Sequence, residues 1–159
     1  NNNWEIIMKY FIILFILFVL CFKARADEVN CLALNIYHEA RNQPLVGKLA
    51  VAQVTINRVE HDNFPDNVCA VVMQGFYTNN HPIKNKCQFS WWCDGKSDKP
   101  KDKQAWQQAQ YLAYQLLDGL FVGIDLVEGA THYHAIYVKP YWIKKKTMVR
   151  KIADHIFYK

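Results

Sequence analysis

The sequence predicts a mainly helical α+β domain, because helical and strand-like patterns occupy different parts of the chain. Three segments between residues 27 and 117 repeat apolar residues at the three- and four-residue spacing of an amphipathic helix. After Gly129 the pattern changes to short runs rich in β-forming residues, at 131–138 and 148–158. A chain of 159 residues with this order fits one α+β domain carrying a small antiparallel β element.

The three helices have recognisable ends. The first is expected over residues 27–41, with acidic residues at its start. The second is expected over residues 45–59, directly after Pro44, which suits the first turn of a helix. Asp102 can cap the third, which runs to Gly119.

Between the second and third long helices the pattern is less regular. Asn67 is expected to cap a short helix around residues 68–72. Residues 76–100 show no clear periodicity, so we expect an irregular connection there. A connection of this length in a small domain is usually functional or held in place by cross-links.

The first 26 residues have the pattern of a secretory signal peptide. Lys9 precedes an unbroken apolar run over residues 10–22, and Lys23 and Ala24-Arg25-Ala26 follow it. A positive flank, an apolar run of this length and a small-x-small end predict cleavage after Ala26. The alternative is a retained signal anchor, although the run is shorter than the roughly 20 residues that span a bilayer. Either form places residues 27–159 outside the cytoplasm, secreted, periplasmic or in the cell envelope.

The cysteines agree with export. Cys21 belongs to the leader, and Cys31, Cys69, Cys87 and Cys93 remain in the exported part. Four cysteines in such a domain indicate two disulfides, for which the sequence permits three pairings. Cys87 and Cys93 are close enough to close a short loop, which would leave Cys31 with Cys69. Zinc binding is the alternative, but the spacings contain no CxxC pair.

The net charge of the chain does not identify its binding partner. The formal net charge is +5 for the whole chain. Removal of residues 1–26 takes away Lys9, Lys23, Arg25 and Glu5, which leaves about +3. Mild positive charge suits an anionic polymer such as a bacterial wall, and equally a nucleic acid or a membrane surface.

Glu39 is the acidic side chain expected to perform chemistry. On a helix it lies one turn beyond Asn35 and Ile36, on or beside the apolar stripe. A carboxyl held against apolar surface loses hydration, so its pKa should rise. A raised pKa suits a general acid that protonates the leaving oxygen of a sugar near neutral pH. The alternative is a Glu at the edge of the stripe that simply reaches water.

A second candidate is the loop Gln88-Phe89-Ser90-Trp91-Trp92, which alternates aromatic rings with hydrogen-bonding side chains. Sugars bind by stacking their C–H faces on aromatic rings while amides and hydroxyls contact their hydroxyl groups. Gln88, Ser90 and Trp91 are therefore expected to line a glycan groove. The alternative is a structural plug pinned by the flanking cysteines.

A third candidate is His132-Tyr133-His134, in which alternate side chains project from one face of a strand. An HxH pair can bind zinc, and a zinc amidase that uses His132 and His134 is one possible reading. No third ligand follows at a recognisable spacing, and the chain has no GxSxG motif and no glycine-rich phosphate loop. We expect no metal or cofactor, and we expect Tyr133 and His134 to steady the bound sugar or the departing oxygen.

These segments resemble the cell wall hydrolase family that includes the SleB-like spore cortex-lytic enzymes. The resemblance covers residues 31–158. It is carried by Ile36-Tyr-His-Glu-Ala-Arg41, Gly47-Lys-Leu-Ala-Val-Ala-Gln-Val-Thr-Ile-Asn-Arg58, Phe64-Pro-Asp-Asn-Val-Cys69, Cys87-Gln-Phe-Ser-Trp-Trp-Cys-Asp-Gly95, Gly129-Ala-Thr-His-Tyr-His-Ala135, Lys139-Pro-Tyr-Trp142 and His155-Ile-Phe-Tyr158. The resemblance implies a lysozyme-like catalytic domain over residues 27–159 that acts on peptidoglycan glycan strands, with Glu39 as the catalytic acid.

The chain departs from the family pattern after Arg41. Many members continue with Gly-Glu-Pro, whereas this chain has Asn42-Gln43-Pro44. The missing Glu removes the main competitor of Glu39 for the catalytic role. It also weakens any proposal that a nearby carboxylate serves as nucleophile.

The expected reaction follows from the single acid. Glycosidases that transfer water usually need two carboxylates, whereas one acid suits a lytic transglycosylase that forms 1,6-anhydro-muramic ends. The alternatives are a hydrolytic muramidase and a non-catalytic peptidoglycan-binding domain. The partners expected are glycan strands rather than nucleic acid, with the membrane contacted only through a retained leader. We expect a monomer, from a bacterium or from a phage that uses it as an endolysin.

Overall fold

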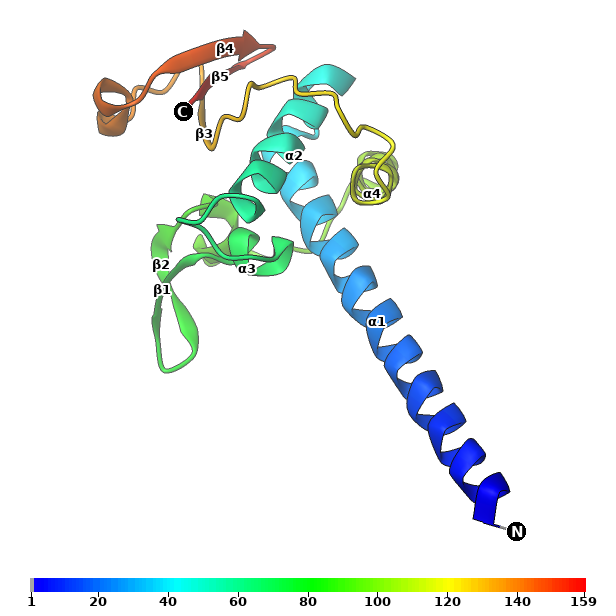
Figure 1. Ribbon diagram of the computed structural model, residues 1–159. Helices are drawn as coiled ribbons and strands as arrows, with labels where there is room; N and C mark the ends of the chain where they lie inside the picture. Colours follow the sequence, from blue (N-terminus) through cyan, green and yellow to red (C-terminus); the bar gives the residue numbers. More distant parts are fainter. Residues whose placement is uncertain (1) are drawn as a thin grey trace.

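Helices form the scaffold of the molecule, and two small antiparallel sheets pack against it (Figure 1). A computed structural model describes residues 2–159. The helices described are α1 (Asn2–Ala40), α2 (Leu45–Val59), α3 (Val68–Val72) and α4 (Lys103–Leu117), with the short 3₁₀ helices η1 (Ser90–Cys93) and η2 (Tyr141–Lys145). Strands β1 (Gly75–Thr78) and β2 (His81–Cys87) form a hairpin. Strands β3 (His132–Ala135), β4 (Met148–Ile152) and β5 (His155–Tyr158) form a sheet in the order β3-β5-β4.

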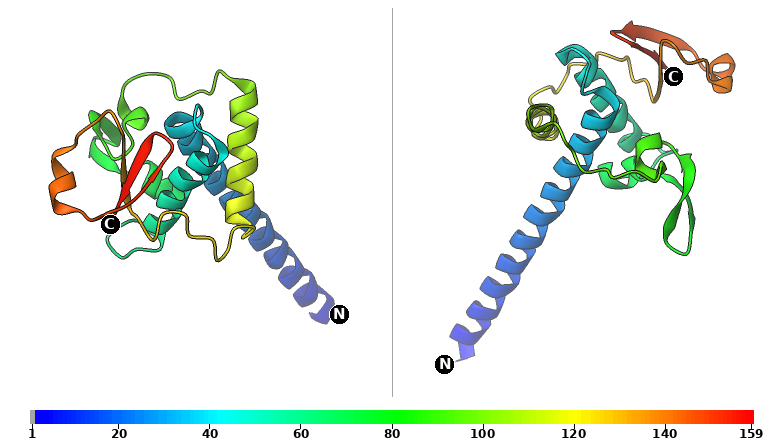
Figure 2. Two further views of the ribbon diagram at one scale, coloured as in Figure 1. Left: turned by 90° about the horizontal axis from the view of Figure 1, so that it is seen from above. Right: turned by 180° about the vertical axis from the view of Figure 1, so that it is seen from behind.

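The predicted leader, as far as residues 2–26 describe it, and the first expected helix form one continuous helix, α1. Its N-terminal half extends away from the rest of the molecule in every view (Figures 1 and 2). Residues 23–28 include no glycine or proline, so nothing in the sequence interrupts the helix between its two parts. By length and composition the apolar part could cross a membrane, a property that signal sequences share.

The C-terminal half of α1 is the centre of the domain. It lies with α2 between α4 on one side and the three-stranded sheet on the other (Figure 2). Its apolar stripe is the expected one, because Leu32, Ala33 and Ile36 have no exposed surface. These residues form the main core with side chains from α3 and α4.

One buried polar network connects three elements across this core. The Asn35 side-chain amide donates to Thr55 Oγ1 of α2 at 3.0 Å. Its carbonyl oxygen Oδ1 accepts from Trp91 Nε1 of η1 at 3.1 Å. Because a buried amide is costly unless it is hydrogen-bonded, this network fixes α1, α2 and the cysteine-flanked loop relative to one another.

Local sequence signals set most helix ends. α2 has the predicted bounds, and the Asn67 and Asp102 side chains cap α3 and α4 by accepting from Ala70 N at 2.8 Å and Ala105 N at 3.0 Å. The short predicted helix and the third long helix are therefore confirmed.

The expectation of an irregular connection over residues 76–100 is wrong, because this region contains the β1–β2 hairpin and η1. The turn of the hairpin is formed by Asn79 and Asn80, whose φ angles are 50° and 62°. Two consecutive positive φ angles are typical of the type I′ turn that suits the twist of a hairpin. Both faces of the hairpin are largely exposed, so its sequence lacks the apolar alternation that would have predicted strands.

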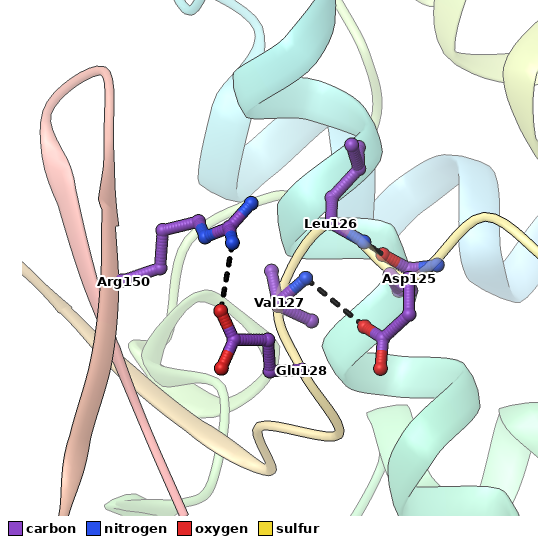
Figure 3. Close-up of polar contacts among 6 residues, drawn as sticks. Asp125, Leu126, Val127, Glu128 and Arg150 are labelled. Carbon is purple, nitrogen blue, oxygen red and sulfur yellow. Dashed lines mark hydrogen bonds and ion pairs between the residues drawn. The ribbon is translucent and has the colours of Figure 1, made fainter.

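The long loop between α4 and β3 is tied to the scaffold. Gln53 Oε1 of α2 accepts from Leu126 N at 2.7 Å, and Asn57 Nδ2 donates to Ala130 O at 2.9 Å. Arg150 of β4 points towards Glu128 and pairs with it at 2.7 Å (Figure 3). These contacts fix the path of the chain into β3, which carries Tyr133 to the site described below.

Both disulfides have the pairing that the spacing favours, Cys31–Cys69 and Cys87–Cys93. The first connects α1 to α3, and the second closes the loop that contains η1. Since the two bonds enclose loops of very different length, they should contribute unequally to stability.

We predict that the double variant Cys31→Ala/Cys69→Ala loses more stability than Cys87→Ala/Cys93→Ala. With sequence separations of 38 and 6, loop-closure entropy gives losses of about 4 and about 2 kcal/mol respectively. Urea unfolding of both variants and the parent chain measures the difference. A larger loss for the shorter loop would contradict the argument.

Candidate active site

Glu39 and Tyr133, which are 94 positions apart, form a direct contact. Glu39 is partly buried near the C-terminal end of α1, and Tyr133 projects from β3. The Tyr133 hydroxyl donates to Glu39 Oε2 at 3.1 Å. The structure thus brings together two of the residues that the sequence suggested.

The Tyr133 ring is held by the neighbouring strand β5. In the antiparallel register Tyr133 pairs with Phe157, and their ring centroids are 5.7 Å apart. The His155 ring meets the Tyr133 ring edge-on at 5.3 Å. Because Phe157 is fully buried, the strand pair fixes the position of the phenol hydroxyl.

Arg58 of α2 adds a buried positive charge that the sequence analysis did not identify. Only 5% of its surface is exposed, and its Nε donates to Thr131 O at 2.7 Å. The guanidinium lies over the rings of Phe64 and Phe89, at 5.2 and 5.1 Å from their centroids. The sequence could have indicated Arg58, because it is a cation one turn after Val54 on the buried face of α2.

Burial raises the pKa of the Glu39 carboxyl above its ordinary value of 4.5. The Tyr133 hydrogen bond and the Arg58 charge favour the carboxylate, so they oppose this increase without cancelling it. Burial and the neighbouring Glu39 raise the pKa of Tyr133 well above its ordinary value. Tyr133 therefore remains a hydrogen-bond donor over the physiological pH range.

Glu39 reaches solvent through a polar pocket of about 330 Å³. The pocket lies between the end of α1, the chain after β3 and the β4–β5 turn. It is lined by His38, Glu39, Arg41, Asn42, Gln43, Ala135, Tyr137, Asp154 and His155. A carboxyl that is partly desolvated and still faces an open pocket can exchange a proton with a bound ligand.

Asp154 is a second carboxylate in this pocket. It is exposed, in the turn between β4 and β5. Gln43 Nε2 donates to Asp154 Oδ2 at 3.2 Å, and Asp154 N donates to Gln43 Oε1 at 3.2 Å. No local pattern predicts this contact, because the two residues are 111 positions apart.

The residues expected from the aromatic loop lie elsewhere. Trp91 is buried in the main core, where its indole stacks on His38 with centroids 4.4 Å apart. Gln88 and Ser90 are exposed at the junction of β2 and η1. Among the described residues that line the Glu39 pocket, none comes from this loop. Trp91 contacts the site only through His38, the residue that precedes Glu39, on which its indole stacks.

His134 projects from the face of β3 opposite to Tyr133. Its Nε2 lies 3.0 Å from the Tyr158 hydroxyl, and its ring stacks on the Tyr158 ring at 5.3 Å. His132, on the same face, contacts Trp142, and burial lowers the pKa of His132 to about 4. Within residues 2–159 no group of three or more His, Cys, Asp or Glu side chains is arranged to hold a metal ion.

The fold and the site together define a mainly helical domain with a small β element and a partly buried acid in a polar cleft. The chain belongs to the cell wall hydrolase family, whose sequence pattern matches residues 42–158. The family resemblance noted in the sequence is thereby confirmed. Glu39 lies three residues before the matched range, so its role is argued from the geometry of the pocket.

Curated relatives are similar over most of this chain. It is 31% identical over 132 residues to a spore cortex-lytic enzyme of Halalkalibacterium halodurans, which covers 82% of this chain and 34% of that protein. It is 26% identical over 132 residues to a spore cortex-lytic enzyme of Bacillus subtilis, covering 82% of this chain and 37% of that protein. The chain thus spans little more than a third of the length of these relatives.

Two solved structures share the fold. The catalytic domain of the germination-specific lytic transglycosylase SleB from Bacillus anthracis superposes with a TM-score of 0.59 at 26% identity, covering 83% of this chain and 93% of that domain. The catalytic domain of the Bacillus cereus SleB protein gives 0.58 at 24% identity, covering 84% and 91%. The predicted mainly helical, lysozyme-like fold is therefore confirmed.

We predict that Glu39→Gln makes the fold more stable at pH 8, by a few degrees in Tm. A carboxyl whose pKa is raised by folding contributes stability at low pH and loses it as the pH rises through the raised value. Gln keeps the shape and can still accept from Tyr133, but it has no charge to desolvate. The difference should disappear below the ordinary carboxyl pKa of 4.5.

Thermal unfolding from pH 4 to pH 8 measures this effect. Glu60→Gln is the matched control, because Glu60 is exposed at the end of α2. A Glu39→Gln chain that is less stable than the parent at pH 8 would contradict the assignment of a poorly hydrated carboxyl.

Proposed function

We propose that this chain cleaves the glycan strands of peptidoglycan outside the cytoplasm, as a lytic transglycosylase with Glu39 as its acid. The observation that carries the proposal is the Glu39 carboxyl, partly buried, hydrogen-bonded by Tyr133 and facing a polar pocket. Membership of the cell wall hydrolase family supports the substrate class. The lytic transglycosylase named among the solved structures supports the reaction type.

The first step is protonation of the leaving oxygen. Tyr133 donates to Glu39 Oε2, so Oε1 is the oxygen that carries the transferable proton. Glu39 gives this proton to the oxygen that joins N-acetylmuramic acid to N-acetylglucosamine, and the bond from that oxygen to C1 of the muramic acid breaks. The Arg58 charge and the Tyr133 hydroxyl stabilise the carboxylate that results.

The second step closes a ring within the substrate. The C6 hydroxyl of the same muramic acid attacks C1, and the Glu39 carboxylate accepts the proton that this hydroxyl releases. The product is a 1,6-anhydro end, no water is consumed, and Glu39 returns to its starting state. One carboxyl that donates and then accepts is sufficient for this cycle.

A hydrolytic muramidase is the second candidate function, because a second carboxylate, Asp154, lines the same pocket. Hydrolysis with inversion uses a second carboxylate, roughly 6.5–9.5 Å from the acid, to activate water. Asp154 is a carboxylate in the same pocket as Glu39. The two reactions are separated by their products, because a reducing end is heavier than an anhydro end by one water.

The leader is proposed to direct export. Its apolar helix and small-x-small end support a signal peptide that is cleaved after Ala26, or a signal anchor that is retained. Either form delivers residues 27–159 to the compartment that contains peptidoglycan.

We predict that Glu39→Gln reduces release of soluble muropeptides from purified sacculi by roughly a hundredfold to ten-thousandfold, because the amide has no proton to donate. Mass spectrometry of the parent digest should show anhydro-muramic ends. Glu60→Gln is the control and should retain full activity. Normal release by Glu39→Gln would end the assignment, and reducing ends alone would favour the muramidase.

Tyr133→Phe should shift the alkaline limb of the pH–activity profile to higher pH. The Tyr133 hydrogen bond lowers the pKa of Glu39, against the increase caused by burial. Without the hydroxyl, the pKa of Glu39 therefore rises further. The acid then stays protonated over a wider range, although kcat should fall because the carboxyl is less well oriented. A profile recorded from pH 4 to pH 9 tests this, and a limb that moves to lower pH would contradict the role of Tyr133.

A further inference from the structure

We propose that Tyr137, Gln43 and Asp154 form a sugar-binding subsite beside Glu39, in which one N-acetylhexosamine unit stacks on the Tyr137 ring and donates hydroxyl hydrogen bonds to Asp154. This inference rests on the proposed function, and it names the part of the site that holds the glycan. None of the three residues belongs to the aromatic loop that the sequence suggested for this role.

Tyr137 combines a place at the Glu39 pocket with an uncovered side chain. It is one of the residues that line the pocket, and 85% of its surface is exposed. Sugars bind aromatic rings through their C–H faces, which requires a ring that no protein group covers. Trp91 lacks this property because His38 stacks on its indole and only 7% of it is exposed.

The backbone on both sides of Tyr137 is fixed although its ring is open. Ile136 N donates to Asp154 O at 2.9 Å, and Val138 N donates to Ala135 O at 2.9 Å. The first bond connects the chain after β3 to the β4–β5 turn. Tyr137 and Asp154 are therefore held on the same wall of the pocket, and a ligand needs to order little more than the phenol side chain.

The Asp154 carboxylate is oriented by Gln43. The two residues exchange two hydrogen bonds, in which Gln43 Nε2 donates to Oδ2 and Asp154 N donates to Gln43 Oε1. The preceding residue, Ala153, has a φ of 49°, a conformation that gives the turn its tight shape. Among the described hydrogen bonds none reaches Asp154 Oδ1, so this oxygen can accept from a sugar hydroxyl.

Gln43 can orient the Asp154 carboxylate because its side chain is an amide. Its NH₂ group donates to Asp154, whereas a carboxylate at the same position would repel it. An aromatic face beside an oriented carboxylate is suited to a neutral saccharide, whose ring supplies C–H groups and whose hydroxyls donate. The glycan strand would then pass from Glu39 towards Tyr137.

Binding to purified sacculi by the inactive Glu39→Gln chain tests the subsite without turnover. In this background Tyr137→Ala should weaken binding by about threefold to tenfold, the range expected for loss of one aromatic stacking contact. Tyr137→Phe should bind like the parent, because the ring remains. Asp154→Ala should weaken binding by a similar factor.

Tyr141→Ala is the matched control. Tyr141 is 87% exposed and close in sequence, but it does not line the Glu39 pocket. Equal binding by the Tyr137→Ala and Tyr141→Ala chains would overturn the subsite while leaving the proposed function intact. Sacculi that neither bind the Glu39→Gln chain nor are digested by the parent would overturn both.

Discussion

The hydrogen bond from Tyr133 to Glu39 is the contact on which the site depends. It joins the end of a helix to a strand 94 positions later, at 3.1 Å, in a partly desolvated position. For the proposed role as an acid, two opposing effects on the Glu39 pKa matter: burial raises it, whereas the Tyr133 hydroxyl and the Arg58 charge stabilise the carboxylate and lower it. The tied loop before β3 and the pairing of Tyr133 with Phe157 both serve to hold that hydroxyl in place.

Much of the helical fold could be predicted from the sequence because its signals are local. The caps Asn67 and Asp102 and the apolar spacing of α2 lie within a few residues of the features that they define. The hairpin around Asn79 and Asn80 could not be predicted in this way. Its strands are exposed on both faces, so burial left no periodic pattern in the sequence.

The candidate site was predictable only in part, because local patterns can be recognised in a sequence whereas tertiary contacts cannot. Glu39 could be proposed as the acid because helix geometry places it on or beside the apolar stripe and because the family resemblance includes its Glu-Ala-Arg motif. The loop that contains Trp91 has the composition expected of a sugar-binding loop. Only a tertiary contact, the stacking of His38 on Trp91, shows that the indole ring is covered. Tyr137 and Asp154 meet at the pocket through the arrangement of β3, β4 and β5, which no local pattern encodes.

The most direct test of the account is titration of the Glu39 side-chain carboxyl by ¹³C NMR, in the parent chain and in Tyr133→Phe. The account requires a midpoint above the ordinary value of 4.5 in the parent, and a still higher midpoint once the phenol hydroxyl is removed. A Glu39 carboxyl that titrates at or below 4.5, or one that does not respond to the loss of the Tyr133 hydroxyl, would contradict the central claim.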